Sequence, residues 1–187
     1  TLQFEPAEET RGQIRLHLSD GEIAANLRGP QWCRLITDAE RTQAIGKLGA
    51  DPIRDDADPE PIRIKVQRSG RSIGSLLMDQ KLFAGVGNIY RAETLFRLGI
   101  SPFTIGKDIT TAQFRSIWAD LVGLMKDGVV AGRIDTVRPE HTPEAMGRPP
   151  RKDDHGGEVY TYRRTGQECF LCATPIKEQV MEGRNLF

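Results

Sequence analysis

Apolar and polar residues alternate through the first part of the chain, the pattern of a strand with one buried face. Two alternating runs are separated by the turn signal Ser19-Asp20-Gly21-Glu22. Their apolar positions are Ile14, Leu16, Leu18, Ile23, Ala25 and Leu27. We therefore predict a hairpin over residues 11–28 whose apolar face packs against another layer.

The pattern then becomes helical. Thr37 and Glu40 form a capping box, which predicts a short helix to about Lys47. The stretch Asp51–Pro61 is rich in Pro and Asp and has no periodic apolar pattern, which indicates a linker.

Three more helices are predicted after this linker. Ser72 is expected to begin a helix through about Leu82, and Asn88 to cap a helix that Gly99 ends. A second capping box, Thr110-x-x-Gln113, opens a longer helix. The positions expected to face inward are Ile73, Leu76, Leu77, Ile89, Ala92, Phe96, Phe114, Ile117, Leu121, Leu124 and Met125.

The last part of the chain has little periodicity. Residues 139–158 have the Pro-, Gly- and charge-rich composition of a flexible loop, and Val159–Arg164 alternates like a strand. Cys169 and Cys172 follow at a spacing that lets one metal ion take both thiolates, as in half of a zinc ribbon. Four ligands are needed, and Cys33 lies far away in the sequence. A redox pair or incidental cysteines are the alternatives.

Composition excludes several classes of protein. The 187 residues can bury a core as one domain or two small ones, and no apolar run approaches membrane-spanning length. Three cysteines and no signal peptide argue against a disulfide framework. Net charge is zero, but residues 63–100 hold seven Lys/Arg against two acids. This excess suits phosphate binding, although a solvated helix face is the commoner role of any single arginine.

Gly85-Val-Gly-Asn88 is a tight corner between two predicted helices. Glycine permits positive φ and close approach, and Asn88 is suited to cap the following helix. The first amides of that helix form a natural phosphate site. A corner of this kind also occurs in purely structural helical bundles.

The corner and its surroundings resemble the helix–two-turns–helix of the formamidopyrimidine-DNA glycosylase / endonuclease VIII family. The resemblance rests on Leu76-Leu77-Met78-Asp79-Gln80, the corner, Tyr90, Glu93 and the exit Gly99-Ile100-Ser101-Pro102. Gly183-Arg184-Asn185-Leu186-Phe187 is similar to the turn before the second Cys-x-x-Cys of the family's zinc finger. The absence of a long Gly-rich loop favours the endonuclease VIII-like branch.

The resemblance implies an α+β fold in five parts. Residues 1–50 would be the latter part of an N-terminal β-sandwich domain with a short helix, and residues 51–62 a linker. Residues 63–137 would be a helical domain with the helix–two-turns–helix. Residues 138–158 would be a flexible loop, and residues 159–187 a partial zinc finger.

The resemblance also implies DNA-contacting residues. Asn88 and Gly87 belong to the corner that binds DNA in the family. Lys47 stands in Lys-Leu-Gly-Ala-Asp, which is similar to a DNA-contacting segment of endonuclease VIII-like members. Arg184 would contact phosphate beside the lesion and act in δ-elimination.

Other implied groups lie partly outside the sequence. One structural Zn²⁺ would be held by Cys169, Cys172 and two further cysteines beyond Phe187. Family enzymes use an N-terminal Pro as nucleophile, the adjacent Glu as acid and a β-domain Lys. None has a match here, and we expect them upstream of Thr1. Glu93 is not a substitute, because its place on the helix indicates a buried carboxylate bound by backbone amides.

We therefore expect a bifunctional DNA glycosylase and abasic-site lyase for DNA repair by base excision. It would remove oxidised bases, with pyrimidines favoured, and cleave the strand by β,δ-elimination. Its partner would be double-stranded DNA with a damaged base or abasic site. We expect a monomer in the bacterial cytoplasm, associated with the nucleoid and not with membranes. The alternatives are a non-catalytic module that binds damaged DNA and an RNA- or ribosome-associated protein.

Overall fold

The computed structural model describes residues 2–7, 12–30, 33–152 and 157–187. Thr1 lies outside these ranges, and so does Arg11, the first residue of the predicted hairpin. Part of the predicted 138–158 loop also lies outside them. The chain divides into two compact units, Thr1–Gly46 and Lys47–Phe187, each described by itself. Among the described residues, no helix has the length and apolar character needed to span a membrane.

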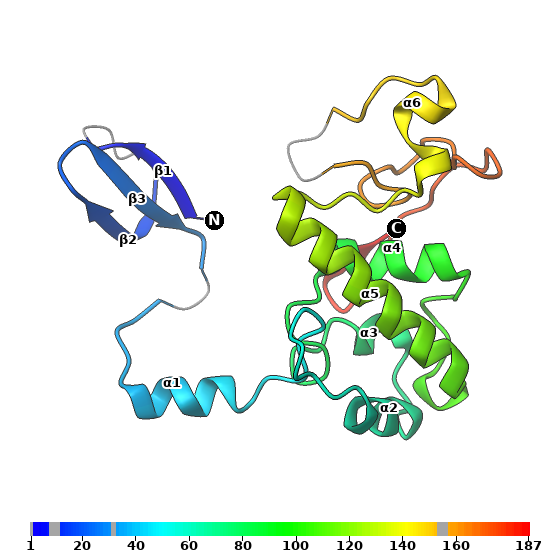
Figure 1. Cartoon of the computed structure of the whole chain (residues 1–187), viewed down its shortest axis with the longest axis horizontal. Coiled ribbons are helices and arrows are strands. Elements are labelled where there is room, and N and C mark those ends of the chain that lie inside the picture. Colours follow the sequence, from blue (N-terminus) through cyan, green and yellow to red (C-terminus); the bar gives the residue numbers. More distant parts are fainter. Residues whose placement is uncertain (1, 8–11, 31–32, 153–156) are drawn as a thin grey trace. The chain divides into compact units, whose positions relative to one another are not determined.

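The first unit is a three-stranded antiparallel sheet followed by a helix (Figure 1). β1 (Leu2–Pro6) and β2 (Ile14–Ser19) pair with opposite edges of β3 (Ile23–Arg28). The predicted hairpin is therefore confirmed for its described residues. Helix α1 (Asp38–Ile45) begins at the predicted Thr37–Glu40 capping box, which is fully formed.

The predicted burial of the hairpin's apolar face is wrong. Its exposed members include Leu16, Leu18 and Ile23. Ala24 and Asn26, which point to the opposite face, are buried instead. Asn26 can be buried because both polar atoms of its side chain have hydrogen-bond partners. Its Nδ2 donates to the Glu5 carboxylate over 2.8 Å, and its Oδ1 lies 2.7 Å from Nδ1 of His17.

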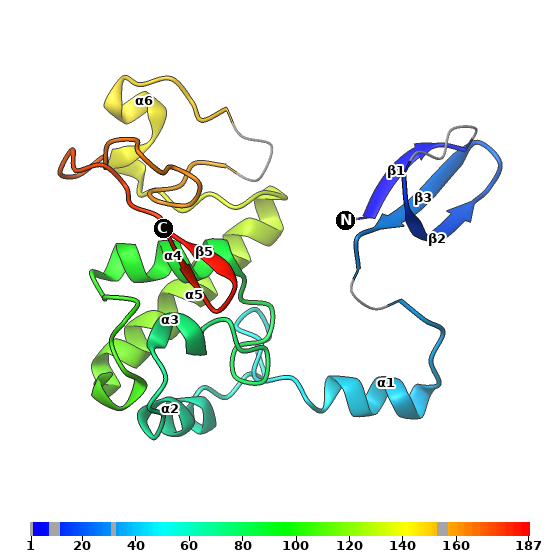
Figure 2. The same cartoon turned by 180° about the vertical axis from the view of Figure 1, so that it is seen from behind.

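The second unit is mainly helical (Figures 1 and 2). Its described residues hold an apolar core cluster. Its main helices are α2 (Glu60–Gln67), α3 (Ile73–Leu76), α4 (Asn88–Leu98) and α5 (Thr111–Ala131). α5 packs across α4, and its five predicted inward residues are all buried. Gly99 ends α4 in the left-handed conformation, and the Thr110–Gln113 capping box opens α5, both as predicted.

α3 is much shorter than the predicted helix, which was expected to reach Leu82. After Leu76 the amides of Met78 and Asp79 bond to carbonyls three residues back instead of four. The Asp79 carboxylate then accepts a hydrogen bond from the Lys81 amide over 3.1 Å. These tighter bonds turn the chain and end the helix.

The linker interpretation of residues 51–62 is wrong at its C-terminal end. α2 begins at Glu60, and Ile62 and Val66 on it are buried in the core. Composition missed this helix because it has only two buried apolar positions and begins beside prolines. Pro at the start of a helix is tolerated, since the first amides have no intrahelical partner.

Two predictions after α5 are also wrong. The described part of residues 139–158 is not a plain loop, because it contains the short helices η2 (Pro139–His141) and α6 (Pro143–Met146). Val159–Arg164 is not a strand. The chain ends in a hairpin of β4 (Gln179–Met181) and β5 (Arg184–Leu186), and β5 contacts α4 (Figure 2).

Candidate nucleic-acid interface

The glycine corner before α4 is shaped by the side chain of Gln80. Its Nε2 donates to the Val86 carbonyl over 2.8 Å, and its Oε1 accepts from the Gly85 amide over 2.9 Å. Gly85 has φ +80°, which favours glycine, whereas Gly87 is extended at φ −112°. Sequence therefore identified the corner correctly, but only its first glycine needs the left-handed conformation.

Asn88 is not the N-cap of α4, contrary to the prediction. Gly87 occupies that position, and Asn88 is the first helical residue. Its side chain instead donates to the Asn185 carbonyl in β5 over 2.8 Å. Asn88 also accepts a hydrogen bond from Arg91, which itself donates to the Asn185 carbonyl over 2.8 Å. Asn88 therefore connects the corner to the C-terminal hairpin.

Arg91 is a buried arginine beneath this connection, with 1% of its surface exposed. Burial lowers its pKa, and the positive charge of Arg184 lowers the pKa further, while Glu182 opposes this. Arg184, on β5, and Asn88, at the start of α4, line the same depression.

Arg184 and Asn88 line one small depression, of about 230 Å³. Its other lining residues are Tyr162, Arg163, Asn185 and Phe187. The structure thus brings together two residues that are 96 positions apart and that sequence alone assigned to DNA binding. It also adds Arg163, which falls in the segment predicted to be a strand and which belongs to no local motif.

A second set of contacts attaches the hairpin to the helical unit. Ser75 donates to the Glu182 carboxylate over 2.5 Å, and Arg71 approaches the same carboxylate at 3.4 Å. Arg71 also pairs with Asp79 at 2.9 Å. Burial raises the pKa of Asp79, but hydrogen bonds from Arg71 and the Lys81 amide outweigh it and hold that pKa below its ordinary value.

Lys47 is exposed and does not line the depression. Two residues later, the Gly49 amide donates to the Gln80 carbonyl over 2.8 Å. A Cβ at Gly49 would lie 2.1 Å from the Leu82 carbonyl oxygen, so only glycine permits this approach. The DNA contact predicted for Lys47 remains a prediction.

Glu93 is fully buried, and its carboxylate is bound as the sequence analysis expected. It accepts from the amides of Tyr160, Thr161 and Tyr162 over 2.7–2.9 Å and from the hydroxyls of Thr136 and Thr161. These amides would otherwise pair with a neighbouring strand, which explains why residues 159–164 do not form one. Glu93 is a structural residue.

The Cys-x-x-Cys segment has a turn suited to metal-bound thiolates. The Leu171 amide lies 3.4 Å from Sγ of Cys169, and hydrogen bonds from Thr174 lower the pKa of Cys172. Such bonds stabilise thiolates, the form that binds metal. Within the described residues, no group of three or more His, Cys, Asp or Glu is placed to hold a metal ion.

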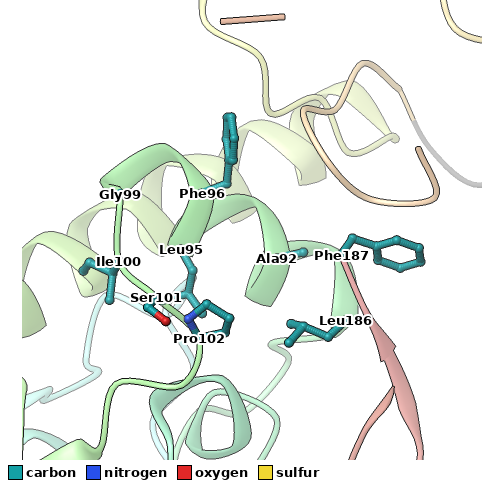
Figure 3. Close-up of a pocket in the computed structure, with 9 residues that line it drawn as sticks. All are labelled: Ala92, Leu95, Phe96, Gly99, Ile100, Ser101, Pro102, Leu186 and Phe187. Carbon is teal, nitrogen blue, oxygen red and sulfur yellow. The ribbon is translucent and has the colours of Figure 1, made fainter. Parts of the chain in front are cut away.

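A second, apolar pocket of about 450 Å³ lies between the end of α4 and the end of β5 (Figure 3). It is lined by Leu95, Ile100, Pro102, Leu186 and neighbouring residues from the end of α4. Phosphate groups need charged or hydrogen-bonding partners, and Ser101 is the one polar side chain among the described residues of this lining, which has no charged residue. The arginine-lined depression is therefore the better candidate for contact with nucleic acid.

Comparison with known proteins agrees with this geometry. Residues 48–138 match the family model described as the formamidopyrimidine-DNA glycosylase H2TH domain. Endonuclease 8 1 of Mycobacterium tuberculosis strain H37Rv is 43% identical over 179 residues, which cover 96% of this chain and 65% of that protein. The chain thus spans just under two thirds of the length of this relative.

Solved structures show the same fold. The MutM (Fpg) protein from Thermus thermophilus aligns with a TM-score of 0.72 at 26% identity, covering 100% of this chain and 70% of that one. A complex between the Lactococcus lactis Fpg and DNA containing an abasic site aligns with a TM-score of 0.71 at 17% identity. It covers 99% of this chain and 68% of that one. The mixed α/β architecture is therefore that of these proteins.

The family assignment rests on a relative that is matched over most of its length. Formamidopyrimidine-DNA glycosylase of Parasynechococcus marenigrum strain WH8102 is 32% identical over 197 residues, which cover 99% of this chain and 68% of that protein. Together with the matched H2TH domain, this similarity shows that the chain belongs to the formamidopyrimidine-DNA glycosylase / endonuclease VIII family.

Proposed function

We propose that this protein repairs DNA by base excision, as a bifunctional DNA glycosylase and abasic-site lyase. The observation that carries this proposal is the single depression lined by Asn88 and Arg184, which belong to two separate motifs of the family. The 43% identity to Endonuclease 8 1 favours oxidised pyrimidines as the substrate class. The substrate is double-stranded DNA with a damaged base or an abasic site.

In this proposal the described residues bind the DNA backbone. Asn88 and the first amides of α4 receive one phosphate at the positive end of the helix. Arg184 binds phosphate beside the lesion and assists δ-elimination, and Gly87 and Lys47 add contacts beside the corner. Such contacts position the duplex without reading its sequence, which suits an enzyme that scans all DNA.

The test is borohydride trapping of the purified protein on duplex DNA with one abasic site. Base excision through an amine nucleophile forms an imine with the ring-opened sugar, and borohydride reduces this imine to a stable covalent adduct. An adduct together with strand cleavage supports the lyase proposal. Binding without any adduct supports the alternative, a non-catalytic module for damaged DNA, and preference for RNA over abasic DNA contradicts both.

We also propose that Cys169 and Cys172 supply two thiolates to one structural Zn²⁺. The hydrogen bond from the Leu171 amide to Sγ of Cys169 and the lowered pKa of Cys172 support this role. When bound, zinc would cross-link this turn to two further ligands and stabilise the C-terminal segment. Metal analysis of the purified protein tests it, because replacing both cysteines by serine should abolish bound zinc, whereas Cys33→Ser should not.

The finer architecture follows from the same assignment. We propose that the three-stranded sheet is part of a β-sandwich, whose other layer would cover the exposed apolar face of Leu16, Leu18 and Ile23. The hairpin of β4 and β5 would be part of a zinc ribbon. A monomer in the bacterial cytoplasm is the remaining expectation.

A further inference from the structure

We propose that Arg163 is a second phosphate-binding residue of the candidate interface, acting beside Arg184. This inference rests on the proposed function and deepens it. Arg163 comes from the segment before the Cys-x-x-Cys turn, whereas Arg184 comes from β5 and Asn88 from α4. All three line the same depression of about 230 Å³.

The backbone of Arg163 is the first argument. Its φ is +53°, in the left-handed region that a residue with a long side chain seldom adopts. Backbone strain of this kind persists where the surrounding structure holds the residue in place, and it is concentrated at functional sites. Here the neighbouring amide of Tyr162 is bound by buried Glu93, and the Arg164 guanidinium is bound by the Tyr160 and Glu168 carbonyls.

The charge balance of the depression is the second argument. Two arginines line it, Arg91 lies buried near Arg184, and none of its described lining residues is acidic. Two carboxylates lie nearby, but among the described residues neither forms an ion pair with Arg163 or Arg184. Glu178 accepts from Asn185 over 2.6 Å, and Glu182 accepts from Ser75 over 2.5 Å and pairs with Arg71 at 3.4 Å. Like charges gathered in this way repel one another until an anion binds between them.

The position of the side chain is the third argument. The Arg163 guanidinium carbon lies 5.6 Å from the centre of the Tyr162 ring. That ring packs edge-on against Phe187 at 5.2 Å, and both rings line the depression. These two rings keep the Arg163 guanidinium at the depression. The guanidinium presents a planar set of N–H donors, which suits the oxygens of a phosphodiester group.

The ligand that fits is the DNA backbone. Two guanidinium groups and the Asn88 side chain can together serve one phosphodiester or two adjacent ones, with no base contact. Arg163 would therefore strengthen binding to every duplex to a similar extent, whatever its sequence. Removing the Arg163 charge should therefore both lower the affinity for DNA and reduce the salt dependence of binding.

The test is a salt titration of binding to a duplex with one tetrahydrofuran abasic-site analogue. Asparagine tolerates the left-handed region, so Arg163→Asn removes the charge without adding backbone strain. We expect about tenfold weaker binding at low salt, a log–log salt slope smaller by about 1, and an unchanged or higher Tm. Arg163→Lys should restore most of the slope, because it keeps the charge.

Arg115→Gln is the matched control, since Arg115 is exposed on α5 and does not line the depression. It loses the same charge and should change the slope little. Equal behaviour of Arg163→Asn and Arg115→Gln, while Arg184→Ala weakens binding, would overturn the role of Arg163 and leave the proposed function intact. No binding of the unaltered protein to either abasic or undamaged duplex would overturn both.

Discussion

At the scale of single residues, Glu93 shows how one carboxylate organises distant segments. It lies on α4 but accepts five hydrogen bonds from residues 136 and 160–162. All of its partners are donors, so an ionised carboxylate satisfies them and a neutral amide cannot.

We predict that Glu93→Gln destabilises the protein by about 2–4 kcal/mol, because the new NH₂ group faces buried donors. Urea denaturation of the unaltered and variant proteins measures this loss. Glu140→Gln, at an exposed position, makes the same chemical change and should stay within about 0.5 kcal/mol. A Glu93→Gln protein as stable as this control would contradict the structural role.

Asp79 carries a prediction about pH. Its pKa in the folded chain lies below the ordinary value of 3.8, because bonds from Arg71 and the Lys81 amide outweigh the effect of burial. Because the pKa is lower in the folded state, the ionised Asp79 carboxylate stabilises the fold at pH values above 3.8. This stabilisation is lost as the pH falls through the pKa of the folded state. We expect an NMR titration of the Asp79 carboxyl to have its midpoint below 3.8. Arg71→Gln should move this midpoint upward, and no movement would contradict the pairing.

At the scale of elements, the C-terminal hairpin is attached to the helical unit at two points. Its turn is attached through Glu182 to Ser75 and Arg71, and β5 through the Asn185 carbonyl to Asn88 and Arg91. Glu182 itself has φ +47° and precedes Gly183 at φ +74°, as a tight hairpin turn requires.

We predict that Ser75→Ala loosens this hairpin while leaving the helical core folded. Loss of a hydrogen bond to a carboxylate costs about 1.5–3 kcal/mol, so amide exchange in β4 and β5 should become at least tenfold faster. Amides of α5 should keep their protection. Uniform acceleration in both regions would show global destabilisation instead of local release of the hairpin.

The elements that sequence predicted well carry their own local signals. Both capping boxes, Gly99 and the α5 stripe depend only on residues within one helix, and all are confirmed. The missing strand has a long-range cause, because a side chain on α4 takes the amides of residues 160–162. The early end of α3 has a local cause, because short-range bonds at Met78 and Asp79 compete with the helical pattern that the apolar spacing favours. The DNA contact of Asn88 stays a prediction, and its bond to the Asn185 carbonyl could not be read from the corner alone.

At the scale of the whole molecule, the two compact units differ in how their apolar residues are placed. All residues of the main core cluster lie between Ile62 and Met125, in the second unit. The first unit leaves Phe4, Leu18 and Ile23 exposed. The free energy of folding of the second unit therefore comes from contacts that it contains itself.

We predict that a fragment of residues 47–187 folds alone, with a main calorimetric transition within about 4 °C of that of the full chain. The isolated fragment 1–46 should instead associate, because contiguous exposed apolar residues favour self-association. Sedimentation velocity checks the second expectation, and a fragment 47–187 without a cooperative transition would contradict the first.

The acceptor that joins β5 to α4 is a main-chain carbonyl, and this has a consequence for how the sequence can diverge. Every amino acid supplies the same carbonyl, so exchange of Asn185 removes only its bond to Glu178 and preserves the join to Asn88 and Arg91. Position 88, in contrast, needs a side chain with both a donor and an acceptor. Relatives can therefore carry other residues at position 185 and still keep Arg184 in place beside the corner. Few residues other than Asn can replace position 88 without loss of this connection.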